Sequence, residues 1–103
     1  MANTFNRVIK TDVPSTEFEA YVVPELTTAI IIGFVLSNKS AGEVQISAKC
    51  ANTQITGSNT VIPATQALSI LDGKIVLVAG DTIDLICNQD SVCDAMISIL
   101  EIS

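Results

Sequence analysis

An unbroken apolar run, AIIIGFVL at residues 29–36, constrains the fold of this chain more than any other segment. A helix that spans a bilayer needs about 20 consecutive apolar residues, whereas Ser37, Asn38 and Lys39 end this run after eight. Three successive isoleucines lose rotamer freedom in a helix, and branched side chains pack well on a pleated sheet. The run therefore predicts a β-strand, and both faces of that strand are apolar.

The remaining segments alternate short apolar runs with turn residues, which is typical of an all-β sandwich or barrel. Residues 44–49 alternate cleanly, since Val44, Ile46 and Ala48 fall on one face and polar side chains on the other. Such a strand shows one side to the core and one to water. Further strands are predicted at residues 5–13, 18–23, 27–37, 61–71, 74–78, 82–87 and 93–102.

Turn signals and chain length complete the predicted architecture. Asp72 and Gly73 separate two apolar runs, and an Asp-Gly pair in that setting predicts a tight hairpin. The polar stretch at residues 51–60 predicts an exposed loop, with a short strand around Ile55 as the alternative. The length of 103 residues is near the usual size of one domain. We therefore expect a single domain, residues 1–103, folded as an antiparallel β-sandwich of about seven or eight strands, either a jelly roll or immunoglobulin-like.

The charge balance excludes two classes of partner. Eleven acidic and five basic residues give a formal net charge of -6. A nucleic-acid binder needs clustered lysines and arginines to neutralise phosphates, and an anionic membrane repels an acidic surface. We therefore expect neither nucleic acid nor a membrane as a partner. The start, MANTFNRVIKTD, also lacks the charged segment and apolar stretch of a secretory signal.

The residue types argue against catalysis. The chain has no histidine, which is the commonest general base near neutral pH and the commonest metal ligand. It contains no G-x-S-x-G nucleophile elbow and no glycine-rich phosphate loop. Asp90 and Asp94 lie near a predicted hairpin tip, where solvated charges are a simpler interpretation than a calcium site. We expect a non-enzymatic protein without a cofactor or metal.

The three cysteines leave two interpretations open. Cys87 and Cys93 flank NQDSV, and if that segment is a hairpin tip, the two can face each other within reach of a disulfide. Alternatively, all three are small apolar core residues in a reducing compartment. Cys50 has no evident partner in either case.

The outward faces of several predicted strands carry the main functional signal. Residues 29–36, 75–78, 83–87 and 95–100 are apolar on both sides, unlike the strands of an isolated sandwich. Loops or tolerated exposure would explain this, but contact with another subunit explains it better. The predicted interface residues are Ile30, Ile32, Phe34, Leu36, Ile75, Leu77, Ile86, Met96 and Leu100.

Three segments together resemble small virion structural proteins of tailed bacteriophages: YVVPELTTAIIIGFVLSNKSAGEVQISAK, IPATQALSILDGKIVLVAGDTIDLI and ISILEIS. The resemblance runs from Tyr21 onward. It implies a β-sandwich accessory subunit of the virion, either a capsid decoration or cement protein or a neck component. Such a subunit forms a homo-oligomer, contacts capsid, portal, neck or tail proteins, and is assembled in the host cytoplasm. The Cys87 and Cys93 pair and the acidic N-terminal part depart from the pattern.

A tail or fibre component that binds a host surface or carbohydrate is the alternative. Sugars stack on exposed aromatic rings, and a chain with one tyrosine and no tryptophan offers few of them.

Overall fold

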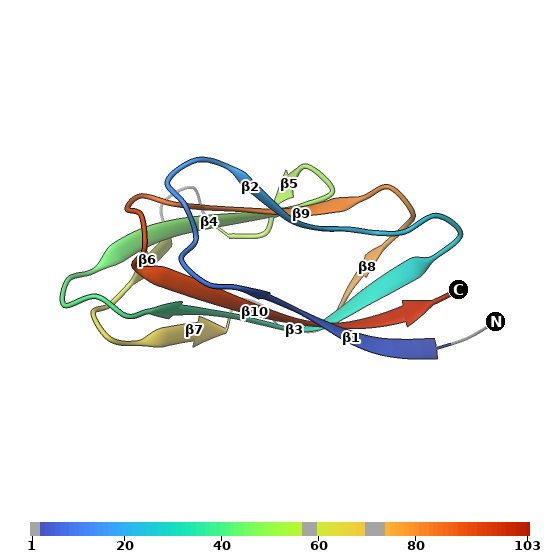
Figure 1. The fold of residues 1–103 in the computed structure, drawn as a ribbon, viewed down its shortest axis with the longest axis horizontal. Helices are drawn as coiled ribbons and strands as arrows, with labels where there is room; N and C mark the ends of the chain where they lie inside the picture. The colour runs from blue at the N-terminus through green and yellow to red at the C-terminus, as the bar shows by residue number, and fades with distance from the viewer. Residues whose placement is uncertain (1–2, 57–59, 70–73) are drawn as a thin grey trace.

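Two five-stranded antiparallel sheets face each other in the computed structural model, which describes residues 3–56, 60–69 and 74–103 (Figure 1). Sheet A consists of β1 (Asn3–Lys10), β3 (Thr28–Asn38), β7 (Ala67–Ser69), β8 (Ile75–Leu77) and β10 (Cys93–Ile102). Sheet B consists of β2 (Phe18–Val22), β4 (Val44–Cys50), β5 (Thr53–Gln54), β6 (Thr60–Ile62) and β9 (Thr82–Cys87). The described residues contain no helix that could cross a membrane.

The strand order is that of a jelly roll. Sheet A runs β1-β10-β3 and ends with β7 and β8, which both pair with β3. Sheet B runs β2-β9-β4 and ends with β5 and β6, which both pair with β4. The chain alternates between the sheets from β1 to β4, continues in sheet B through β5 and β6, enters sheet A with β7 and β8, and ends with β9 in sheet B and β10 in sheet A, as in two interlocked Greek keys. The predicted β-sandwich is confirmed. The ten strands occupy eight strand positions, because β7 and β8 share one edge position of sheet A, and β5 and β6 share one edge position of sheet B.

The predicted Asp-Gly hairpin is wrong, because its flanking strands run in the same direction. In β7, Ala67 to Ser69 lie opposite Ser37 to Val35, and in β8, Ile75 to Leu77 lie opposite Ile31 to Ala29. Both segments are therefore antiparallel to β3 rather than to each other. Asp72 and Gly73 themselves lie outside the described residues.

A tight hairpin instead lies in the stretch predicted as a loop. Cys50 pairs with Thr53, and the two residues between them, Ala51 and Asn52, have φ values of 52° and 60°. Two consecutive residues with positive φ are the signature of a type I′ turn, whose twist matches that of the flanking strands. Asn tolerates this conformation, whereas Ala adopts it at a cost.

A β-bulge changes which side chains of β3 face the core. Ser98 lies opposite Gly33 and Ile99 opposite Ile31, so Ile32 is an extra residue on β3. Because side chains alternate along a strand, one extra residue reverses the facing of all that follow. Odd-numbered Ile31 is therefore buried before the bulge, and even-numbered Phe34 is buried after it.

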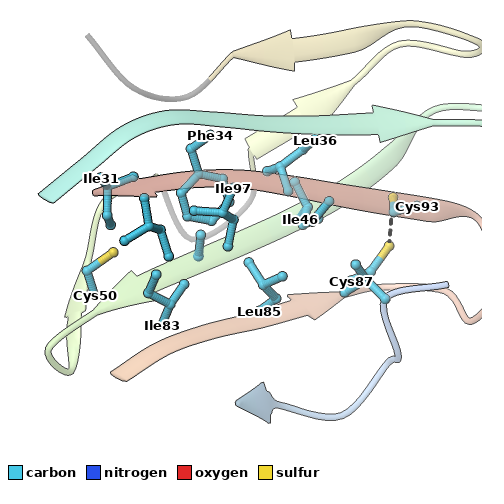
Figure 2. Close-up of a cluster of buried hydrophobic side chains, with 14 of the residues drawn as sticks. Ile31, Phe34, Leu36, Ile46, Cys50, Ile83, Leu85, Cys87, Cys93 and Ile97 are labelled. Atoms are coloured by element: carbon cyan, nitrogen blue, oxygen red, sulfur yellow. Dashed lines mark hydrogen bonds between the residues drawn. The ribbon is translucent and has the colours of Figure 1, made fainter. Parts of the chain in front are cut away.

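The core fills the space between the sheets (Figure 2). Its largest fully buried side chains come from β3, β4, β9 and β10 and include Phe34, Ile31, Leu36, Ile46, Ile83, Leu85, Ile97 and Ile99. Their removal from water is the main driving force for folding. The buried polar side chain of Asn38 is fully bonded at one end of this core. Its Nδ2 donates to the carbonyl of Ile62 at 3.0 Å, and its Oδ1 accepts from the Ser40 amide at 2.9 Å.

Candidate functional site

The outer face of sheet A carries a row of apolar side chains that crosses four strands. Residues directly opposite each other in antiparallel strands point to the same side of the sheet. Phe5 of β1 lies opposite Leu100 of β10, Leu100 opposite Ile30 of β3, and Ile30 opposite Val76 of β8. These four side chains point away from the core, because their neighbours along each strand face inward.

A second apolar row lies parallel to the first. Ile9 of β1 lies opposite Met96 of β10, which lies opposite Val35 of β3. The bulged residue, Ile32, is also exposed between the two rows. We call the two rows together with Ile32 the apolar face of sheet A.

The apolar face is open to solvent. The exposed fractions are 77% for Phe5, 62% for Val76, 51% for Ile9, 49% for Met96, 41% for Ile32 and 39% for Val35. Such values show that no described segment of the chain covers these side chains. Contiguous apolar patches of this kind on soluble proteins commonly mark interaction sites.

The apolar face carries little charge. The row between the two apolar rows consists of Arg7, Ser98 and Gly33. Arg7 and Asp94 are the charged residues at the described outward positions of the sheet A strands. At one end of the sheet, Asp94 shares Lys39 with Asp12, and the Lys39 Nζ lies 3.0 Å from the Asp94 carboxylate.

The outer face of sheet B is more polar, although Val22 and Val61 are also exposed there. Glu19 lies opposite Asp84, Asp84 opposite Lys49, and Lys49 opposite Gln54, so a polar row crosses four strands. Lys49 also pairs with Glu17 at 3.4 Å. A shallow hollow beside this row contains no carboxylate, lysine or arginine, and its lining residues are Ser15, Gln45, Ile46, Ser47, Ile86, Cys87 and Asn88. The Cys87 thiol is its one titratable side chain.

The predicted interface residues are only partly on one surface. Ile30, Ile32, Met96 and Leu100 belong to the apolar face of sheet A. Their part in an interface remains a prediction. Ile86 is half-buried and faces outward on sheet B instead.

The prediction was wrong for four of the nine residues. Phe34 and Leu36 are fully buried because the bulge at Ile32 turns them inward, and Leu77 is 2% exposed. Ile75 lies opposite the buried Ile31 and packs against the core. Even spacing along an all-apolar strand gives no sign of a bulge.

Sequence reasoning missed Phe5, Ile9, Val35 and Val76. Phe5, Arg7 and Ile9 lie on one side of β1, but this side includes a charged residue and the other side includes polar residues such as Asn6. The sequence of β1 therefore shows no clearly apolar side. Only the register with β10 shows that Phe5 and Ile9 extend the apolar rows.

The cysteines all lie in the core. Cys87 Sγ and Cys93 Sγ are 3.2 Å apart, and both side chains are buried as free thiols (Figure 2). They belong to different sheets, so the predicted hairpin between them is wrong even though they meet. Cys50 is buried elsewhere, and this burial raises the pKa of its thiol to about 11. Within the described residues, no group of three potential metal ligands is found.

Comparisons with known proteins identify the fold alone. No protein-family model and no curated protein matches the chain. One solved structure, described as "Bacillus endospore appendages form a novel family of disulfide-linked pili", matches with a TM-score of 0.54 and 12% identity, over 98% of this chain and 88% of that chain.

Two structures of a pentameric capsid protein isolated from metagenomic phage sequences are more distant. Each has a TM-score of 0.36 and 18% identity over 92% of this chain, and this chain covers 59% and 64% of those chains. At these values the phage structures carry no argument. The appendage structure shows that a chain of very different sequence has a similar fold.

Proposed function

We propose that this protein is a non-enzymatic structural subunit that assembles with copies of itself through the apolar face of sheet A. The observation that carries the proposal is the contrast between the two outer faces. One has two apolar rows open to water, and the other has a polar row at the corresponding place. Both faces enclose the same core, so folding alone does not require the difference.

The size of the apolar side fits a second copy. The molecule measures 46 × 21 × 20 Å along its principal axes, so one broad side offers an area on the order of 900 Å². A stable protein interface needs roughly 800 Å² from each partner. Two copies that pack sheet A against sheet A place the same surface on both sides, as in an isologous dimer interface.

The charge distribution fits the same partner. The chain carries a formal net charge of -6, which opposes close approach of two copies at most orientations. The apolar face carries fewer charges, because Arg7 and Asp94 are the charged residues at its described outward strand positions, and Asp94 shares Lys39 with Asp12. Contact there leaves the exposed Glu17 and Glu19 on the sheet B side in water.

We further propose that the assembly is part of a tailed-bacteriophage particle, as a capsid decoration, cement or neck subunit. The sequence resemblance from Tyr21 onward supports this, and jelly rolls are widely used in viral capsids. The similar fold of a pilus-forming appendage protein fits a role in a repeated assembly. Since a fold does not fix a function, the test is mass spectrometry of density-purified particles, in which the chain must copurify at a constant ratio to the major capsid protein.

Carbohydrate binding by a tail or fibre component receives less support. Phe5 is the one strongly exposed aromatic side chain in the described residues. Phe34 is in the core, Phe18 lies 4.5 Å beneath the Lys10 ammonium, and the Tyr21 hydroxyl donates to Glu101. Specific, saturable binding on a glycan array would reverse this ranking.

The self-assembly proposal is tested by light scattering across a concentration series, with two matched variants. Met96 on sheet A and Val22 on sheet B are 49% and 50% exposed. We expect the unchanged protein to form a discrete multimer, Met96→Glu to be a folded monomer, and Val22→Glu to keep the multimer. A monomeric unchanged protein at high concentration, or equal dissociation by both variants, would contradict the proposal.

A further inference from the structure

The contact between Cys87 and Cys93 joins the two sheets at one end of the sandwich. Cys87 is the last residue of β9 in sheet B, and Cys93 is the first residue of β10 in sheet A. Their Sγ atoms are 3.2 Å apart, and the side chains point toward each other across the gap between the sheets (Figure 2). No strand pairing connects the sheets at this point.

The main chains of both cysteines are held by consecutive residues of one connection. The Val13 amide donates to the Cys93 carbonyl at 2.8 Å, and the Cys87 amide donates to the Pro14 carbonyl at 3.0 Å. Val13 itself is fully buried. A disulfide bond is about 2.05 Å long, so the sulfur atoms need to approach by only about 1 Å, a movement that small side-chain rotations supply.

We propose that Cys87 and Cys93 are a redox site that forms an intramolecular disulfide linking sheet A to sheet B when the protein meets an oxidised low-molecular-weight disulfide such as oxidised glutathione. One cysteine thiolate attacks the reagent, forms a mixed disulfide and releases one reduced glutathione. The second thiolate then attacks the protein sulfur of the mixed disulfide and releases another. The two cysteines lose two protons and two electrons, and the electrons reduce the reagent.

Burial controls when the reaction takes place. Burial of Cys93, with a contribution from its contact with Cys87, raises the pKa of its thiol to about 12. The thiolate is the attacking species and must reach the reagent, and both side chains are at most 1% exposed, so the folded protein reacts slowly at neutral pH. The bond forms faster while the chain folds or when this end of the sandwich opens. Once formed, it constrains the unfolded chain and stabilises the folded state.

Cys50 provides an internal control, because it is also buried but has no cysteine close to it in the described residues. The full chain is refolded once in reducing buffer and once in a buffer of oxidised and reduced glutathione. Free thiols are then alkylated under denaturing conditions and mapped by peptide mass spectrometry. We expect three alkylated cysteines in the reduced sample and only Cys50 alkylated in the oxidised sample.

The thermal midpoint separates a structural bond from an incidental one. The oxidised protein should unfold at a temperature higher by on the order of 10 °C. Cys50→Ala should keep this difference, and Cys93→Ala should abolish it. Three free thiols after oxidative refolding, a bond to Cys50, or a bond between two chains would each overturn the proposal. None of these results depends on whether the apolar face forms an interface.

Discussion

On sheet A, the row of Phe5, Leu100, Ile30 and Val76 crosses four strands. In sheet B, a row at a comparable place consists of Glu19, Asp84, Lys49 and Gln54. The strands of both sheets place apolar residues on their inner sides, as a common core requires. The comparison teaches that the core determines which residue types occupy the inward positions. The outward positions are not constrained by the core, so their residue types can differ between the two sheets according to what each surface contacts.

The largest expected effect distinguishes inward from outward positions on one strand. Phe34 is fully buried and its neighbour Val35 is 39% exposed. Phe34→Ala should lower the free energy of unfolding by about 3–5 kcal/mol, because it leaves a cavity. Val35→Ala should cost less than about 1 kcal/mol. Urea unfolding of variants made monomeric by Met96→Glu measures both, and similar losses would mean that the bulge does not place these residues as described.

Converting sheet B to the chemistry of sheet A should change the mode of assembly. Glu19→Val and Gln45→Ile replace exposed polar residues beside Val22, Val61 and Ile86, and burying two such side chains is worth about 3 kcal/mol. The concentration needed for larger assemblies should fall by on the order of 100-fold. If both outer faces bind another copy, the assemblies have no fixed size. Sedimentation velocity would detect this as a broad distribution of large species.

The Met96→Glu change provides the control for this conversion. Added to the double variant, it should limit growth to a finite species that associates through sheet B. Unlimited growth in the triple variant would show that the altered residues cause non-specific aggregation.

A change inside the sandwich should affect stability without affecting assembly. Tyr21 of sheet B donates to the Glu101 carboxylate of sheet A, at the opposite end from the cysteine pair. Tyr21→Phe removes this bond and should lower the free energy of unfolding by about 1 kcal/mol. The multimer mass by light scattering should stay the same. Dissociation of the Tyr21→Phe multimer would contradict this prediction, because it would show that assembly depends on the stability of the sandwich.

The same tyrosine gives a pH dependence with a defined sign. Partial burial, then the hydrogen bond to Glu101 and its charge, raise the pKa of Tyr21 well above its usual value near 10. The unfolded chain therefore loses this proton first, and the stabilising contribution is complete below about pH 10 and declines above it. Tyr21→Phe should show a smaller loss of stability from pH 10 to 11. Absorbance titration follows the group directly, because it is the only tyrosine.

The smallest expected effect is that of salt on assembly. The apolar face carries Arg7 and an Asp94 that shares Lys39 with Asp12, so few attractive charges are available for screening. Raising the salt concentration should leave the association constant unchanged or increase it a few-fold, because it screens the repulsion between two acidic copies. A marked decrease in the multimer with salt would indicate an interface built on ion pairs, such as the outer side of sheet B.

The sequence was sufficient for the sandwich and most of its strands, but not for the pairings that join distant segments. The single strand predicted at residues 61–71 is wrong, because β6 lies in sheet B and β7 in sheet A. Alternation in β4 identified its inner face, because apolar and polar residues differ there. In β3 both sides are apolar, so nothing in the pattern marked the extra residue at Ile32. The choice between jelly roll and immunoglobulin-like order depends on which strands meet, and a local turn signal at Asp72 pointed to the wrong pairing.

The candidate site shows the same limit. Four of the nine predicted interface residues lie together on the outer face of sheet A. For these four, the spacing along the strand correctly predicted an outward side chain. The rest of that face comes from β1 and β8, whose registers with β10 and β3 are long-range properties. One of the two interpretations of the cysteines had Cys87 and Cys93 meeting across a hairpin, whereas the closure of two sheets over one core brings them together.

The segmented edges of the sandwich also affect whether another copy can add a strand to either sheet. The edge of sheet A beyond β3 is divided between β7 and β8, and the edge of sheet B beyond β4 between β5 and β6. β2 has a register irregularity between Glu19 and Tyr21, and β1 carries Arg7 and Lys10. Short, irregular or charged borders are poor templates for strand addition. Strand addition along the hydrogen-bonding directions is therefore disfavoured, so the proposed self-association is directed to the apolar face and away from fibre formation.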